Sequence, residues 1–224
     1  MDSSIKIRAI VTGASGMVGE GVLHECLQHP QVEAVLVVGR RTCGVIHPKL
    51  KEIILADFFH PSSIETEFKG YNACYFCLGV SSVGMKEPEY YRLTYTLTLG
   101  FAEALSRQNT DIVFCYVSGG GTDSTEKGRS MWARVKGKTE NDLRKLPFKK
   151  VYAFRPGYMH PTKGLKNTLP FYKYVSWLYP FVRKFFPKYA TTLKELGLAM
   201  INITLYSYQK QIIEVPDIVE LAKQ

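Results

Sequence analysis

The sequence predicts an α/β fold in which a doubly wound parallel sheet is covered by helices on both faces. Short apolar runs alternate with helical patterns along most of the 224 residues, and this alternation is typical of parallel sheets. The runs are apolar almost throughout, which indicates strands buried on both faces. No internal repeat or long linker interrupts the pattern, so we expect one domain over residues 1–224.

The elements follow one another in a regular order. The predicted strands are Ile5–Val11, Ala34–Val38, Glu52–Leu55, Ala73–Leu78, Asp111–Val117, Val151–Phe154 and a short last strand at Gln211–Val215. The predicted helices are Gly19–Gln28, Pro88–Arg107, Ser130–Leu146 and Leu193–Tyr206, with one or two helical turns in 57–69. Prolines at 170, 180 and 187 predict short helices with turns over Leu169–Ala190.

The turn after the first strand is rich in glycine. It reads G-x-x-G-x-x-G and leads directly into the first helix. Glycines let the backbone approach a pyrophosphate, and the N–H groups of the new helix point at the phosphate oxygens. The turn therefore predicts a dinucleotide site, with candidate residues Gly13, Ala14, Ser15, Gly16, Met17, Val18 and Gly19.

Composition and charge narrow the class of protein. The formal net charge is +9, but the basic residues are spread widely, so we expect a generally basic surface rather than a nucleic-acid site. Five cysteines are scattered over the chain, which favours free thiols; Cys74 and Cys77 lie in an apolar run and are expected to pack rather than bind metal. No signal peptide or membrane-spanning stretch fits, and we expect a cytoplasmic protein without a metal site.

The end of the second strand indicates which dinucleotide is preferred. Binders of NAD usually place an acidic residue there, whereas binders of NADP favour arginine on the 2′-phosphate. Here the strand ends in Gly39 and continues with Arg40 and Arg41, so we expect NADP(H) to be preferred and NAD(H) to be possible. Residues after the third and fourth strands are expected beside the adenine and ribose: Asp57, Phe58, Leu78, Gly79 and Val80.

Together these residues resemble the short-chain dehydrogenase/reductase superfamily, in its extended and atypical branches. The resemblance covers most of the chain and includes T-G-A-S-G-M-V-G, Asp57, Ser118, Lys136 and the run Arg155-Pro156-Gly157. The pattern is similar to epimerase/dehydratase-like, NmrA-type and Tat-interacting oxidoreductase-like proteins. It implies a Rossmann-type fold, with Ser118 and Lys136 in the site. By the same resemblance, further cofactor contacts are expected from Val117, Lys136, Pro156, Gly157 and Met159.

One position departs from the family pattern. Active members carry Y-x-x-x-K on one helix, where the lysine lowers the pKa of the tyrosine that exchanges a proton with the substrate. Here Trp132 precedes Lys136 by four residues, and an indole N–H has no usable acid–base pKa. The proton donor is then another residue: Tyr158 is the catalytic candidate beside Ser118 and Lys136, and the other tyrosines in view are Tyr90, Tyr91 and Tyr95.

Two other interpretations stay open. The protein could act as an isomerase or reductase that needs only electrophilic help from Ser118 and Lys136, or it could bind NADP(H) without turnover. The sequence predicts an NADP(H)-dependent oxidoreductase or epimerase-like enzyme acting on a small carbonyl or hydroxyl substrate. The alternative is a catalytically inactive NADP(H)-binding regulatory or partner-binding protein.

The C-terminal region, about 158–224, is expected to contribute the substrate pocket. Its aromatic residues suggest an apolar or aromatic ligand: Phe171, Tyr172, Tyr174, Trp177 and Tyr179. The same aromatic and basic stretch could instead form an interfacial membrane anchor, but the pocket is the favoured interpretation.

Overall fold

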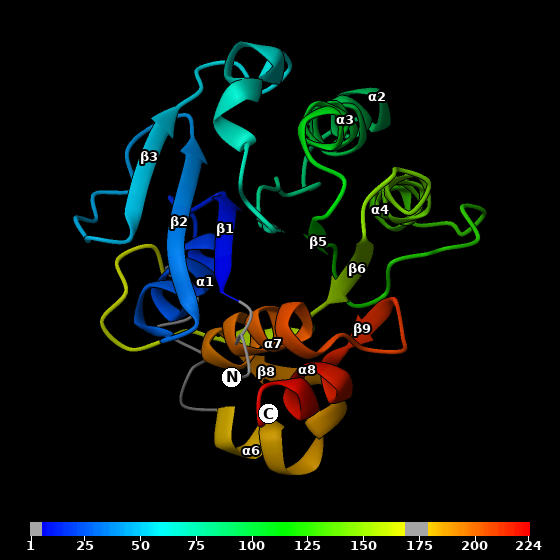
Figure 1. Ribbon diagram of the computed structural model, residues 1–224. Coiled ribbons are helices and arrows are strands. Elements are labelled where there is room, and N and C mark those ends of the chain that lie inside the picture. Colours follow the sequence, from blue (N-terminus) through cyan, green and yellow to red (C-terminus); the bar gives the residue numbers. More distant parts are fainter. Residues whose placement is uncertain (1–5, 169–178) are drawn as a thin grey trace.

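A seven-stranded parallel sheet forms the centre of the molecule (Figure 1). The computed structural model describes residues 6–168 and 179–224. The strands stand in the order β3-β2-β1-β4-β5-β6-β9, and every neighbouring pair is parallel. Their bounds are β1 Ile7–Thr12, β2 Val32–Gly39, β3 Leu50–Ile54, β4 Ala73–Phe76, β5 Val113–Val117, β6 Lys150–Arg155 and β9 Ile212–Glu214. The predicted doubly wound parallel fold is confirmed.

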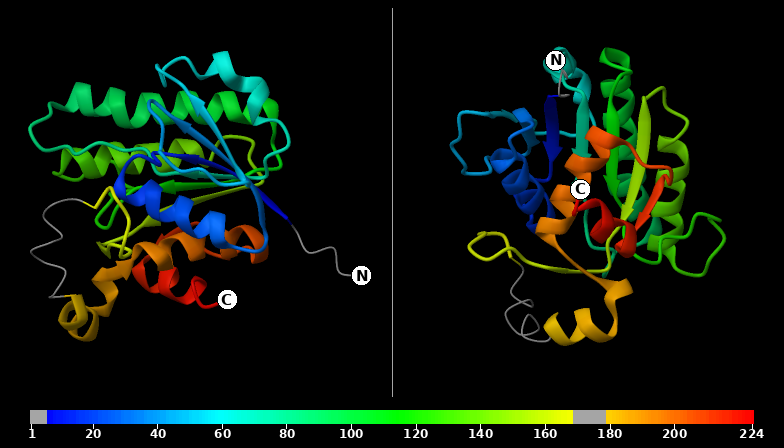
Figure 2. Two further views of the ribbon diagram at one scale, coloured as in Figure 1. Left: turned by 90° about the vertical axis from the view of Figure 1, so that its left-hand side faces the viewer. Right: turned by 60° about the horizontal axis from the view of Figure 1, so that its bottom comes forward.

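Helices cover both faces of this sheet, as Figures 1 and 2 show. One face carries α1 (Met17–Gln28), α7 (Leu193–Tyr206) and α8 (Val215–Leu221). The other carries η1 (Pro61–Phe68), α2 (Glu87–Tyr91), η2 (Arg92–Thr96), α3 (Leu97–Gln108) and α4 (Met131–Leu143). Each helical layer packs on the sheet to form an apolar core. One core lies under α1 and α7, and the other lies under α3. This arrangement leaves the carboxyl ends of the strands at one common edge.

Two elements differ from the prediction, and a third is found where it was expected. The edge strand β3 is only partly buried, so burial on both faces holds for the central strands and not for this one. The predicted long helix 88–107 is continuous but changes pitch, because a π-helical turn, η2, joins α2 to α3. The turns expected in 57–69 form the 3-10 helix η1.

A second, two-stranded sheet was not predicted. It pairs β7 (Tyr158–His160) in parallel with β8 (Ala190–Thr192). Between them lie α6 (Tyr179–Phe185) and the 3-10 turn η4 (Pro187–Tyr189), each with a proline in its first turn where Pro180 and Pro187 predicted short helices. The elements predicted within 169–178, and the pocket aromatics Phe171, Tyr172, Tyr174 and Trp177, lie outside the described residues.

The cysteines pack as expected. Cys74 lies in the core under α3, whereas Cys77 packs against the core under α1, so the two thiols face opposite sides of the sheet. All five cysteines are free thiols. In the part of the chain that the structure describes, none of the helices could cross a bilayer.

Candidate functional site

The turn between β1 and α1 needs its glycines for different reasons. Gly13 adopts φ +72°, and a Cβ there would lie 2.8 Å from the Cys77 carbonyl carbon. A Cβ at Gly19 would lie 2.2 Å from the Gly13 oxygen, so a side chain at either position would disrupt the turn. Gly16 has ordinary extended backbone, and a Cβ there would meet only the Gly13 oxygen, at 3.5 Å. A side chain at Gly16 would therefore fit the fold and occupy the space above the turn.

A groove runs along the carboxyl edge of β2, β1 and β4 in three adjoining hollows. The first is lined by Arg40, Ala56, Asp57, Phe58, Phe59, Leu78, Gly79, Val80, Leu93 and Leu97. The second is lined by Gly13, Ser15, Gly39, Arg40, Arg41 and Leu78. The third is lined by Gly13, Gly16, Met17, Val18, Gly19, Cys77, Gly79 and Met159. Because neighbouring hollows share residues, the groove brings most of the predicted cofactor-binding residues onto one surface.

The N-terminus of α1 opens into this groove. Its N-cap, Gly16, supplies no side-chain hydrogen bond, so no side chain of the cap occupies the N–H groups of the first turn, and Glu20 in that turn accepts the N–H groups of Lys166 and Asn167 instead. Such an end suits a pyrophosphate, and the space above Gly16 leaves room for it. Ala14 is buried beneath the turn instead of lining it.

The doubly basic turn is held by a carboxylate that the sequence analysis did not single out. Glu52, on β3, accepts hydrogen bonds from the Thr42 hydroxyl (2.7 Å) and the Cys43 N–H (2.6 Å). Although burial opposes the shift, these hydrogen bonds lower the pKa of the Glu52 carboxyl. The side chains of Arg40 and Arg41 are exposed beside the second hollow and make no ion pair among the described residues.

The first hollow is shaped by the turn after β3. The Asp57 carboxylate accepts the Phe59 N–H at 2.9 Å and contacts His60 Nδ1 at 2.7 Å; the backbone hydrogen bond chiefly lowers the pKa of Asp57. Phe58 stacks on Phe101 in the core, which anchors the turn. Phe59 lies under the guanidinium of Arg92, 4.7 Å away. The resulting wall is largely apolar, with one carboxylate at its rim.

Ser118 and Lys136 meet at the end of β5. The Ser118 N–H and hydroxyl both donate to the Phe154 carbonyl, at 2.8 and 3.1 Å. The Lys136 ammonium donates to the Ser118 carbonyl oxygen. Burial lowers the pKa of Lys136 to about 8, although Glu140 opposes this shift. The structure therefore joins these two predicted residues through the Ser118 backbone, while the serine hydroxyl is turned toward β6.

Trp132 lies one helical turn before Lys136. A Cβ built at Gly121 would be 3.6 Å from the edge of the indole, and one built at Gly119 would be 3.9 Å from it. The indole ring thus packs against the glycine turn that follows Ser118. A Cβ at either position would make only ordinary van der Waals contact with the ring, so Gly121 is needed for its φ of +87°, which residues with a side chain rarely adopt.

The tyrosine candidates lie in different surroundings. Tyr158 is on β7, where its ring stacks on Tyr179 with centroids 6.2 Å apart and burial raises its pKa. Tyr90 is fully buried. Tyr95 donates to Asp142 at 2.8 Å, and its ring packs against that of Tyr91 in a tilted arrangement. Of these four, Tyr158 alone follows the Arg-Pro-Gly run that continues from β6.

That run also has packing roles. The Pro156 carbonyl accepts the Gly120 N–H at 2.9 Å, which ties it to the glycine turn. A Cβ at Gly157 would lie 2.4 Å from the Tyr189 oxygen, so glycine is required where β7 approaches β8. Val117 ends β5 partly buried, and Met159 reaches the third hollow of the groove.

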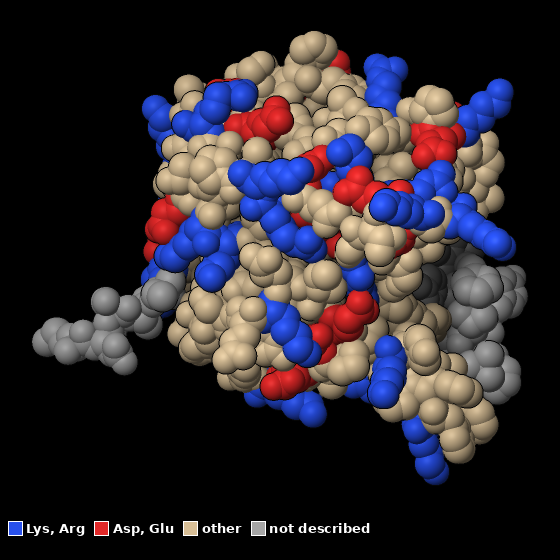
Figure 3. All heavy atoms as spheres, turned by 90° about the vertical axis from the view of Figure 1, so that its right-hand side faces the viewer, with Lys and Arg blue, Asp and Glu red and all other residues tan. Residues whose placement is uncertain are grey.

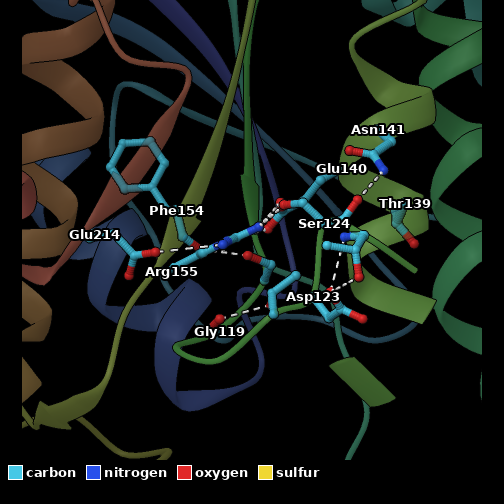
Figure 4. Close-up of polar contacts among 12 residues, drawn as sticks. Gly119, Asp123, Ser124, Thr139, Glu140, Asn141, Phe154, Arg155 and Glu214 are labelled. Carbon is cyan, nitrogen blue, oxygen red and sulfur yellow. Dashed lines mark hydrogen bonds and ion pairs between the residues drawn. The ribbon is translucent and has the colours of Figure 1, made fainter. Parts of the chain in front are cut away.

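Sequence reasoning missed a buried ion pair behind this end of the site (Figure 4). Arg155 donates to both carboxylate oxygens of Glu140, at 3.0 and 2.6 Å, and also to the Ser124 hydroxyl. Glu214 on β9 lies 3.6 Å from the same guanidinium. Glu140 follows Lys136 by one turn of α4, so the pair fixes that helix against β6 and β9. The arginine was visible in the sequence, but its partner was not.

Comparison with known proteins agrees with this geometry. Residues 9–128 match the model of the "NAD dependent epimerase/dehydratase family". The chain is 27% identical over 154 residues to "Protein FMP52-2, mitochondrial" of Scheffersomyces stipitis, a match covering 67% of this chain and 66% of that protein. Two further curated relatives are also named as mitochondrial proteins. The expected cytoplasmic location is wrong by this comparison.

Solved structures share the fold at low identity. The dTDP-glucose 4,6-dehydratase DesIV of Streptomyces venezuelae, solved with NAD and TYD bound, aligns with a TM-score of 0.70 at 14% identity, covering 93% of this chain and 75% of that one. The ADP-L-glycero-D-manno-heptose-6-epimerase of Helicobacter pylori aligns with a TM-score of 0.66 at 14% identity, covering 100% and 82%. Since the family model matches more than half of the chain, the protein belongs to the NAD-dependent epimerase/dehydratase family, whose members bind a nicotinamide dinucleotide.

Proposed function

We propose that this protein is an NADP(H)-dependent oxidoreductase or epimerase-like enzyme that acts on a small carbonyl or hydroxyl substrate. The observation that carries the proposal is the contact between Lys136 and Ser118 at the carboxyl edge of the sheet. Burying an ammonium group costs free energy, so a largely buried lysine at this edge favours a functional role over a purely structural one. The ammonium is suited to hold a ribose hydroxyl and to assist proton transfer beside it.

The groove supports a specific orientation of the dinucleotide. The apolar first hollow suits the adenine, with Asp57 at its rim, and the N-terminus of α1 suits the pyrophosphate. Arg40 and Arg41 line the second hollow, between the positions proposed for the adenine and the pyrophosphate. A 2′-phosphate there would accept charge-assisted hydrogen bonds from them. At the other end, Met159 with Val117, Pro156 and Gly157 would enclose the carboxamide.

Cofactor preference is tested by calorimetry with NADPH and NADH. NADPH should bind more tightly, and Arg40→Ala with Arg41→Ala should remove the difference. Each lost charge-assisted hydrogen bond should cost about 1.5–3 kcal/mol, or roughly ten- to a hundredfold in affinity. Arg129→Ala, at another exposed arginine, is the matched control and should change neither constant. Equal affinities for the two cofactors in the unmutated protein would refute the preference.

The bound nicotinamide would supply or accept a hydride, so the chain must move a proton. We assign that proton to the Tyr158 hydroxyl, because Trp132 cannot exchange one. Lys136, charged below about pH 8, would stabilise the oxyanion that forms at the donor or substrate. The Ser118 hydroxyl, now donating to Phe154, would have to turn toward the substrate to assist.

The proton donor is tested in a steady-state assay of carbonyl reduction with NADPH. Tyr158→Phe should lower the rate by about 10²–10⁴-fold, the usual range for a general acid. Tyr206→Phe, at an exposed tyrosine, is the control and should leave the rate unchanged. Trp132→Tyr should change little if Tyr158 is the donor. A large increase in the reduction rate from Trp132→Tyr would instead show that a tyrosine at position 132, four residues before Lys136, is the effective proton donor.

The second candidate function is NADP(H) binding without turnover, and Trp132 is the observation that favours it. In that case NADPH should raise the melting temperature or alter partner binding, while a broad panel of carbonyl compounds and sugar nucleotides gives no cofactor consumption. Protein that binds NADPH and remains inactive across such a panel would decide for this alternative.

A further inference from the structure

We infer that α6 and η4 form a docking surface for an anionic lipid bilayer, with aromatic side chains entering the interface and lysines contacting the phosphate headgroups. We call this surface the aromatic-basic patch. Its residues are Phe181, Lys184, Phe185, Phe186, Lys188 and Tyr189. The inference concerns where the protein binds, and it is independent of the proposed reaction.

The aromatic members of the patch are exposed to an unusual degree. The exposed fractions are 61% for Phe181, 55% for Phe185, 56% for Phe186 and 67% for Tyr189. Phe181 and Phe185 are one helical turn apart and their rings contact, with centroids 4.4 Å apart. Single exposed apolar residues are common on protein surfaces, but contiguous ones mark interaction sites. The favoured prediction of a substrate pocket from this stretch therefore does not describe these four side chains.

The patch projects from the body of the molecule. In Figure 1, α6 lies below α7 and α8, outside both helical layers that cover the sheet, and Figure 2 shows the same projection from the side. Rings that face outward from a projection can enter an interface without unfolding any element.

Charge identifies the partner. Residues 143–194 contain twelve Lys and Arg and no Asp or Glu. The next acidic residue, Glu195, is already paired with Arg183 at 2.6 Å, so its charge is neutralised within the fold. Lys184 and Lys188 make no ion pair among the described residues. Figure 3 shows this difference: Lys and Arg are mixed with Asp and Glu over the body, whereas the charged side chains in view on the projection at the lower right are all basic.

This combination favours an anionic bilayer over the other occupants. Aromatic rings with flanking lysines are typical of segments that lie in the interface of anionic membranes. A second copy of this chain would bring two equally basic patches together, and like charges would oppose that contact. A neutral bilayer would use the rings alone and leave the lysines without a partner.

The test measures binding of the full-length protein to sedimented vesicles of phosphatidylcholine with about 30% phosphatidylglycerol, compared with phosphatidylcholine alone. The protein should sediment with the anionic vesicles and be released by about 0.5 M salt, which screens the headgroups. Lys184→Gln with Lys188→Gln should weaken binding by about 25-fold, since each lysine near the surface contributes about fivefold. Phe181→Ser with Phe185→Ser and Phe186→Ser should abolish it.

Matched controls separate the patch from general effects. Lys69→Gln with Lys223→Gln removes two exposed charges elsewhere, and Ile46→Ser with Val83→Ser removes two exposed apolar side chains elsewhere. Both pairs should bind like the unmutated protein. Melting temperature and NADPH affinity report whether each variant is folded, and if the triple variant unfolds, the lysine pair alone decides.

Four results would overturn the inference. The first three are absence of binding by the unmutated protein, equal binding to neutral vesicles, and equal loss of binding in the control pairs. A fourth is light scattering that shows a dimer which the triple variant converts to a monomer without any vesicle binding, because the patch would then be an interface between copies.

Discussion

The two ends of the candidate site are constructed from different parts of the chain. Near β1 the groove is formed by backbone, with glycines at 13, 16 and 19 and an uncapped helix N-terminus. Near β5 and β6 it rests on buried charges, since Lys136 contacts Ser118 and Arg155 pairs with Glu140. A backbone site depends on space and conformation, whereas a site held by buried charges depends on each partner remaining in place. Mutation should therefore separate binding from stability at the first end and combine them at the second.

The largest effect is expected at the charged end. Arg155→Met leaves the Glu140 carboxylate buried without its partner and should lower the free energy of unfolding by about 3–5 kcal/mol. Urea denaturation measures this loss. The double variant Arg155→Met with Glu140→Leu removes both charges and should recover most of the stability. A loss below about 1 kcal/mol in the single variant would contradict the view that this pair holds α4 in place.

The backbone end should behave differently. Gly16→Val places a side chain in open space above the turn, so the free energy of unfolding should change by no more than about 0.5 kcal/mol. The valine should block phosphate contacts, and loss of two of them lowers NADPH affinity by about 100-fold or more. Calorimetry and urea denaturation give the two values. Gly19→Val is the contrast, because its side chain would collide with the Gly13 carbonyl and should destabilise the fold.

Binding at normal affinity by Gly16→Val would mean that the phosphates lie elsewhere. Equal destabilisation by both valines would mean that the turn has no freedom at Gly16. Either result would remove the contrast between the two ends.

The smallest effect is expected from pH. Burial lowers the pKa of Lys136 to about 8, below its ordinary value near 10.5, so the ammonium loses its proton as pH rises through 8. NADPH affinity should then fall by about tenfold between pH 7 and 9, the loss of one charged hydrogen bond. Lys136→Met should bind weakly with no such pH dependence. A pH-independent affinity in the unmutated protein would show that the ammonium does not contact the cofactor.

The backbone end could be predicted from the sequence, whereas much of the charged end could not. Three glycines at this spacing, between an apolar strand and a helix, are typical of a phosphate-binding turn, so the local sequence was sufficient there. The partner of Arg155 could not be chosen, since Glu140 lies fifteen residues away on a helix with several other charged residues. Likewise, the sequence shows that Trp132 departs from the family pattern, but only the structure shows the indole packed against the glycine turn.

The C-terminal third illustrates a different limit. The helix 193–206 was predicted with the correct bounds, because its apolar period is strong and Thr192 with Glu195 forms a capping box. The pairing of β7 with β8 was missed, since three-residue strands carry no measurable period. The prediction that the aromatic residues of this region line a pocket is wrong for the exposed rings of α6 and η4. Aromatic composition alone does not distinguish a pocket from an exposed surface.

The small sheet has an evolutionary consequence. The small sheet pairs residues 158–160 with residues 190–192, so both ends of the connecting segment are held next to each other. A segment whose ends are held in this way can be lengthened, shortened or replaced without altering the register of the main sheet or the residues around Ser118. Proteins that descend from one ancestor could thus change the binding partner of this segment while the groove along β1, β2 and β4 stays the same.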